Sequence, residues 1–176
     1  MTIPKQFQYL ATEPGPRILL EALKTYGVTE TPGIGSNPEI MGWAKAVNAR
    51  YSGDDVPWCA LGMSYWALQA GWDVPPFSLS ALAWRQFGAV VDPANAMLGD
   101  VLIFKRKGGG HVGLYVGETD TSVAVLGANQ SDKVCIEWKS KARVFAARRC
   151  PWRVNQPANV RKIILNSSGP VSGKEA

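Results

Sequence analysis

The first feature of the sequence that can do chemistry is a cysteine at the start of a predicted helix. Cys59 follows Pro57 and Trp58 and opens a segment of helical apolar spacing that ends at Gly71. The first turn of a helix carries unpaired N–H groups and the positive end of the helix dipole, and both favour a thiolate. We therefore expect Cys59 to be a nucleophile. The alternative is a small apolar residue that packs the helix, because free cysteine is among the most buried residue types.

The single histidine is the candidate base for this thiol. His111 follows three glycines at 108–110 and begins a predicted strand, which fixes the direction of its side chain. Imidazole titrates near neutral pH and can take a proton from a nearby thiol. The sequence thus supplies one cysteine–histidine pair.

Two amide side chains follow the next apolar strand, at Asn129 and Gln130. An amide oxygen that accepts from the imidazole N–H fixes its tautomer and orientation, which is the third role in a catalytic triad. Side chains alternate along a strand, so only one of the two faces the histidine. We expect Asn129 to take this role, with Gln130 as the alternative.

Composition limits the classes of protein that the chain can be. With 176 residues, 46% hydrophobic and 19% charged, it is typical of one soluble globular domain. No apolar run is long enough for a transmembrane helix, and the N-terminus has no signal-peptide pattern, so we expect no stable membrane insertion. Three cysteines argue against a disulfide framework, and a single histidine argues against structural zinc. We expect no metal and no cofactor.

The chain is basic, with a formal net charge of +5 and a pI of about 9.2. Such a surface suits a negatively charged partner. The sequence has no stacking-aromatic RNA-binding motif and no helix-turn-helix pattern, so we do not expect nucleic acid as the partner. An anionic bacterial envelope fits the charge better.

The predicted elements change from helical to extended along the chain. Spacing predicts helices over 16–26, 38–47, 59–70 and 80–88, and strands over 101–104, 111–116, 122–126, 134–138 and 144–147. This segregation favours an α+β fold, in which helices pack on an antiparallel sheet of about five strands. We expect a loosely attached arm and a helix over 1–35, the main domain over 36–155, and a partly disordered tail over 156–176.

Four segments together resemble a known superfamily. They are PWCA at 57–60, GDVLIF at 99–104, GHVGLYVG at 110–117 and LGANQSDKV at 126–134. From 38 to 152 the chain resembles the NlpC/P60 and CHAP peptidoglycan hydrolases, most of all their phage-associated small-hydrolase branch. The resemblance implies a papain-like fold and peptidoglycan as the partner.

The resemblance also implies roles for individual residues. It makes Cys59 the nucleophile, His111 the base and Asn129 the third member of the triad. The backbone N–H of Cys59 is a natural oxyanion donor, and we considered the residues Tyr51 and Gln130 as auxiliary groups. We expect the substrate cleft to be shaped by Trp58, Ser80 and Trp84.

The predicted activity is cleavage of an amide bond in the stem peptide of the cell wall. The predicted setting is a phage endolysin, a monomer made in the host cytoplasm and acting in the periplasm or cell wall after export by a holin or a secretion system. The alternatives are an interbacterial effector amidase, an acyltransferase or deamidase with the same triad, and a catalytically silent module that binds the envelope.

Overall fold

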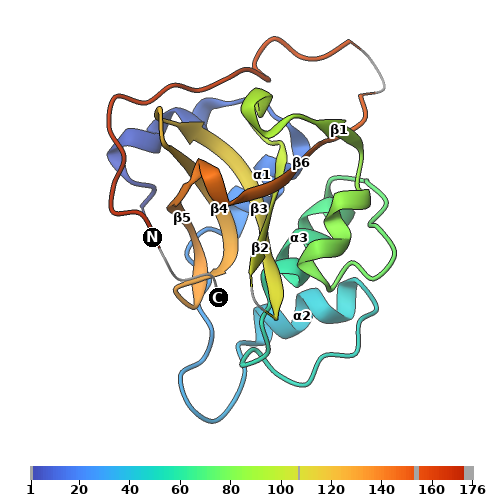
Figure 1. Cartoon of the computed structure of the whole chain (residues 1–176). Helices are drawn as coiled ribbons and strands as arrows, with labels where there is room; N and C mark the ends of the chain where they lie inside the picture. The colour runs from blue at the N-terminus through green and yellow to red at the C-terminus, as the bar shows by residue number, and fades with distance from the viewer. Residues whose placement is uncertain (1, 107, 153–154, 173–176) are drawn as a thin grey trace.

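A twisted antiparallel sheet carries His111, Asn129 and Gln130 (Figure 1). The computed structural model describes residues 2–106, 108–152 and 155–172. Within these, six strands pair in the order β1-β6-β2-β3-β4-β5, and all neighbours run antiparallel. Their bounds are β1 (Ala89–Val91), β2 (Val101–Arg106), β3 (Gly109–Glu118), β4 (Ser122–Gln130), β5 (Lys133–Ser140) and β6 (Val144–Arg149).

The helices pack around α3, which supplies the end that carries the cysteine. Their bounds are α1 (Arg17–Lys24), α2 (Pro38–Ala46) and α3 (Cys59–Gln69). Both α1 and α2 contact α3, and α3 lies on β3 and β4 (Figure 1). Burial from several sides explains why α3 is apolar around most of its circumference. The predicted α+β class, with helices on an antiparallel sheet, is confirmed.

The sheet has more strand residues than predicted, because short or irregular strands show no recognisable alternation of apolar and polar residues. β1 has only three residues, too few for an alternation to be recognised. β2 continues to Arg106 and β3 begins at Gly109, so the ladder extends into the segment 105–110 that separates the two predicted strands. The predicted fourth helix is instead a 3₁₀-helix, η2 (Ala81–Gln86), and the Ser80 side chain makes no capping hydrogen bond.

The N-terminal segment is not a loose arm. Residues Lys5–Thr12 form the 3₁₀-helix η1, and its Phe7 and Leu10 side chains are buried in the core. Phe7 also packs against the ring of Trp138 on β5. That prediction was wrong because two apolar anchors outweigh the polar residues between them.

The C-terminal segment pairs with two strands of the sheet. Its backbone forms parallel bridges that pair Ile164 with Glu118 and Val171 with Trp138. The partial disorder expected over 156–176 stays a prediction, and residues 173–176 lie outside the described residues. Two further 3₁₀-helices, η3 (Pro93–Asn95) and η4 (Lys141–Arg143), precede β2 and β6.

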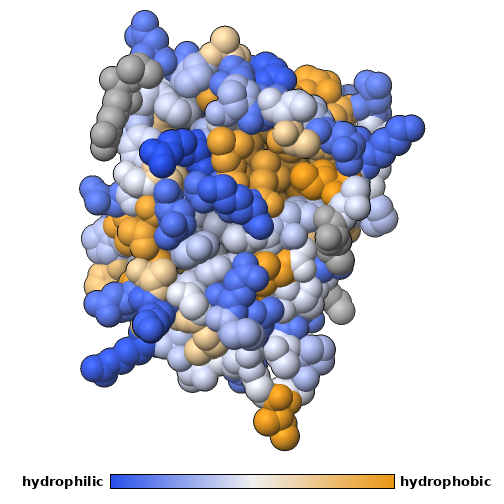
Figure 2. Space-filling model, turned by 180° about the vertical axis from the view of Figure 1, so that it is seen from behind, coloured by the Kyte–Doolittle hydropathy of each residue, from blue (hydrophilic) through white to orange (hydrophobic). Residues whose placement is uncertain are grey.

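The surface mixes hydrophilic and hydrophobic groups. Figure 2, which views the molecule from behind, shows patches of hydrophobic side chains among hydrophilic ones. Large apolar side chains that stay exposed include Ile34, Phe77 and Val90. Among the described helices, none has the length and apolar character needed to cross a membrane.

Candidate active site

Cys59 is the first residue of α3 and only 3% exposed. Trp58 is the N-cap, and its carbonyl accepts the first helical hydrogen bond from Gly62 at 3.0 Å. Burial raises the pKa of the Cys59 thiol, and the N–H groups of Val112, Ala60 and Cys59 itself oppose this shift. The N–H groups at the helix start therefore lower the pKa of the thiol as expected, but burial raises it by more. The resting group is a neutral thiol.

His111 lies on β3, fully buried, and is oriented by Gln130 at the end of β4. Its Nε2 is 3.0 Å from Gln130 Oε1. The Gln130 amide nitrogen donates to the carbonyls of Val125 at 3.0 Å and Cys135 at 2.7 Å. Since carbonyls only accept, the amide oxygen must face the imidazole, and Nε2 must carry the hydrogen. In a neutral ring this leaves the lone pair on Nδ1.

Nδ1 is the ring nitrogen of His111 that could accept a proton. Among the described residues, no group hydrogen bonds to His111 Nδ1. Burial lowers the pKa of His111 to about 3, with a further contribution from the charge of Lys139, while the hydrogen bond to Gln130 opposes the shift. The Cys59 thiol interacts with the N–H of Val112, the residue that directly follows His111. The imidazole is therefore neutral, and its Nδ1 lone pair has no partner among the described residues.

Asn129, predicted as the orienting residue, contacts Trp58, and it is Gln130 that hydrogen bonds to the His111 imidazole. With its side-chain oxygen turned toward Trp58, it accepts from the backbone N–H at 3.0 Å and from the indole N–H at 3.2 Å. The physical reason is a register shift in β4 between Gly127 and Gln130, where Asn129 has φ +52°. Simple alternation fails at such a bulge. Asn129 thus braces the residue that precedes the nucleophile.

Gly127 was not identified from the sequence. A Cβ at this position would lie 2.8 Å from Gln130 Cδ and 3.1 Å from His111 Nε2. The missing side chain leaves the space in which the imidazole and amide meet. A glycine inside a strand often marks a close approach of this kind, which is the signal that could have found it.

Lys139 was also missed, and the sequence offers no sign of it. This β5 lysine is 1% exposed, and its Nζ lies 3.3 Å from Glu137 Oε2 and 6.0 Å from the centre of the Phe104 ring. The Phe104 ring is in turn 6.2 Å from the His111 ring. A lysine in an alternating strand looks solvent-facing, yet this one places a buried positive charge near the base.

Of the remaining predicted site residues, Trp58 and Trp84 are buried, whereas Ser80 is exposed and Tyr51 is partly exposed. The Tyr51 hydroxyl donates to the carbonyl of Val56 at 2.7 Å, and burial together with the nearby Cys59 raises its pKa. Trp58 and Trp84 are fully buried, so they brace the site and present no open face to a ligand. Ser80 is exposed and remains available to a cleft.

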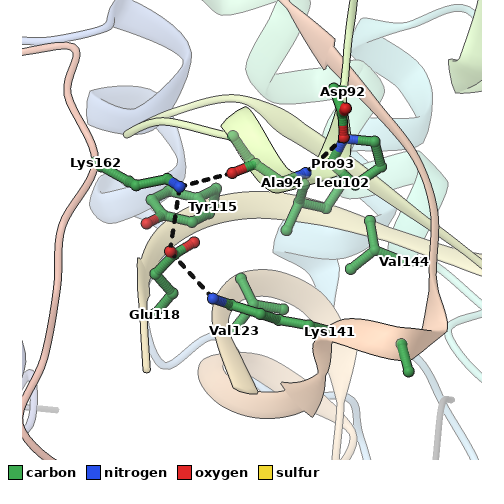
Figure 3. A pocket seen from close by; sticks show the side chains of 12 residues that line it. Asp92, Pro93, Ala94, Leu102, Tyr115, Glu118, Val123, Lys141, Val144 and Lys162 are labelled. Atoms are coloured by element: carbon green, nitrogen blue, oxygen red, sulfur yellow. Dashed lines mark hydrogen bonds and ion pairs between the residues drawn. The ribbon is translucent and has the colours of Figure 1, made fainter. Parts of the chain in front are cut away.

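A cavity on the sheet is separate from these residues (Figure 3). It measures about 550 Å³, and none of the candidate catalytic side chains lines it. At its edge the buried Glu118 carboxylate lies 3.1 Å from Lys141 Nζ and 3.6 Å from Lys162 Nζ. This cluster joins η4 and the C-terminal segment to β3, so its evident role is structural. In the described residues, no cluster of three or more His, Cys, Asp or Glu side chains could hold a metal ion.

Comparison with known proteins agrees with the architecture. The structure is similar to the P60 domain of an antigen from M. avium paratuberculosis, with a TM-score of 0.51 and 17% sequence identity. The match covers 83% of this chain and 96% of that domain. No family model matches the sequence, and no curated protein matches it either. The chain therefore has the fold of a P60 domain.

Proposed function

We propose that this protein is a cysteine hydrolase that cleaves an amide bond in the stem peptide of peptidoglycan. The observation that carries the proposal is the hydrogen bond between His111 and Gln130, which leaves Nδ1 free near a thiol at a helix start. The P60-like fold supports the substrate class. The basic surface suits an anionic envelope.

In the proposed reaction, His111 Nδ1 takes the proton of Cys59 as the sulfur attacks the amide carbonyl carbon. The carbonyl oxygen becomes an oxyanion, which the N–H of Cys59 at the helix start stabilises. The resulting imidazolium gives its proton to the leaving amine, and the C–N bond breaks to leave a thioester. Water, deprotonated by the same nitrogen, then attacks the thioester carbonyl. The C–S bond breaks, the carboxylic acid is released, and the sulfur takes the proton back from the imidazolium.

The surrounding residues support this cycle electrostatically. Gln130 accepts from Nε2–H throughout, so it stabilises the imidazolium without changing position. Both partners are neutral at rest, because burial raises the pKa of Cys59 and lowers that of His111. The ion pair therefore forms together with the attack, when the oxyanion donors can compensate its charge.

The test is digestion of purified Gram-negative sacculi by the wild type and by Cys59→Ala, with mass spectrometry of released muropeptides. We expect defined fragments from the wild type and none from the variant, and the fragment masses identify the amide that is cut. If neither protein releases fragments while both bind the sacculi, the hydrolase proposal fails and an envelope-binding module takes its place.

The biological setting stays a prediction. A phage endolysin would lyse a Gram-negative host only when it reaches the periplasm. We expect expression with a holin, or fusion to an export signal, to cause lysis that Cys59→Ala does not. Lysis without either would contradict the proposed route, and an effector would instead depend on a secretion system.

A further inference from the structure

Phe77 combines two features that are rare together. Its side chain is 86% exposed, and its backbone has φ +58°, a conformation that bulky residues seldom adopt. Buried contacts impose this geometry. The carbonyl of Ser78 accepts from Trp84 Nε1 at 2.9 Å and from Ser64 Oγ at 3.3 Å, and the N–H of Ser80 donates to the Phe77 carbonyl at 2.8 Å. The fold thus holds an aromatic ring outward at a cost in backbone strain.

The ring of Phe77 borders a groove that contains no charged side chain. The groove measures about 390 Å³ and is lined by Val47, Asn48, Ala49, Phe77, Ser78, Leu79 and Ser80. It therefore offers an aromatic face, aliphatic groups, one amide and two hydroxyls. On a chain with a formal net charge of +5, such a neutral surface favours an uncharged ligand with one apolar face.

Each wall of the groove is followed along the chain by a residue that contacts or influences the neighbourhood of the candidate catalytic pair. The wall at 47–49 precedes Tyr51, which lies close enough to Cys59 for the thiolate to affect its pKa. The wall at 77–80 precedes Leu82, which packs against Gly110, the residue before His111. A Cβ on Gly110 would lie 2.8 Å from Leu82 Cδ2. The groove is therefore built from two segments that continue along the chain into residues near the candidate catalytic pair.

We propose that this groove binds an N-acetylated sugar of the glycan strand, with one face of the sugar ring against Phe77. The proposal rests on the proposed peptidoglycan substrate. Stem peptides carry carboxylates and amines, which would find no opposite charge here, whereas the glycan sugars are uncharged once the peptide is attached. Sugar C–H groups suit the aromatic face, and the acetamido and hydroxyl groups suit Asn48, Ser78 and Ser80.

The experiment compares two substrates that share one scissile bond, a disaccharide-tetrapeptide and the free tetrapeptide. The variant is Phe77→Gly, because glycine adopts a positive φ freely and the fold should not suffer. We expect kcat/KM to fall about tenfold on the disaccharide-tetrapeptide, a loss typical of an aromatic contact, and to stay within about twofold on the free peptide. Phe145→Ala, at a phenylalanine 45% exposed on β6 and outside the groove, should change neither.

The inference is overturned if Phe77→Gly lowers both rates equally or lowers neither. A binding measurement separates this outcome from failure of the proposed function. Titration of Cys59→Ala with an N-acetylglucosamine tetramer, followed by NMR, should shift signals of residues 47–49 and 77–80, and adding Phe77→Gly should abolish the shifts. If the wild type releases no fragments from sacculi, the proposed function fails, and the titration still decides the sugar site.

Discussion

His111 and Gln130 are joined by a hydrogen bond that can run in only one direction. The Gln130 amide nitrogen is committed to two backbone carbonyls, so its oxygen must accept from His111 Nε2–H. The tautomer of the His111 imidazole is therefore set by the contacts that Gln130 makes with β4 and β5.

Replacing Gln130 with methionine should release this constraint. We expect kcat to fall at least tenfold, because the imidazole then samples the tautomer in which Nδ1 carries the hydrogen. Imidazole ¹⁵N chemical shifts measure the tautomer directly and should show Nε2–H in the wild type. Asn129→Ala, which removes the contact to Trp58, should leave those shifts unchanged. A wild-type ring protonated on Nδ1 would contradict the assignment.

Gly127→Ala should disturb the same contact sterically. The added methyl would lie 2.8 Å from Gln130 Cδ, so the amide must move away from the imidazole. We expect activity on sacculi to fall at least tenfold while the circular dichroism spectrum is retained. The matched control is Gly42→Ala inside α2, where a Cβ meets nothing within 4 Å. That variant should keep full activity and gain up to about 1 kcal/mol of stability.

The buried neutral histidine predicts how stability depends on pH. The unfolded chain binds a proton at His111 near the ordinary pKa of 6.5, but the folded protein does so only near 3. Stability from this group is therefore full above pH 6.5 and decreases as the pH falls toward 3, by up to about 1.4 kcal/mol per pH unit. Urea titrations between pH 7 and pH 4 measure the slope. His111→Asn should flatten it, and an unchanged slope would exclude His111 as its source.

Lys139→Met tests the buried charge behind the base. Removing the positive charge should raise the pKa of His111, because one of the causes that lower it is lost. We expect the acid limb of kcat/KM and the NMR titration of His111 to move to higher pH. Lys24→Met changes a lysine on the exposed face of α1 and should move neither curve. Movement to lower pH would show that Lys139 acts through structure.

Periodicity predicted the elements that bury one continuous face. The α3 segment and the strands around Val101 and His111 are recognisable because their apolar residues repeat over several positions. The same reasoning placed Cys59 at the start of a helix and His111 on a strand. These features depend on local sequence, which a single chain displays in full.

The features that escaped prediction depend on contacts between distant segments. The sequence left the choice between Asn129 and Gln130 open, because a bulge in β4 interrupts the alternation that would decide it. Phe7 orders the N-terminal segment by packing against Trp138, about 130 residues later in the chain. Lys139 looks like a surface lysine until the neighbouring strands enclose it. None of these contacts produces a repeating pattern of apolar residues that could be recognised in the sequence.

The bridges that tie outlying segments to β5 have a consequence for behaviour at high concentration. β5 is the last strand of the sheet, and an open edge strand is a template for pairing with another molecule. Here Thr29 pairs with Lys133 at one end of β5, and Val171 pairs with Trp138 toward the other. The C-terminal segment thus covers part of the β5 edge and hinders edge-to-edge aggregation. A chain shortened before residue 170 should lose solubility before it loses its fold.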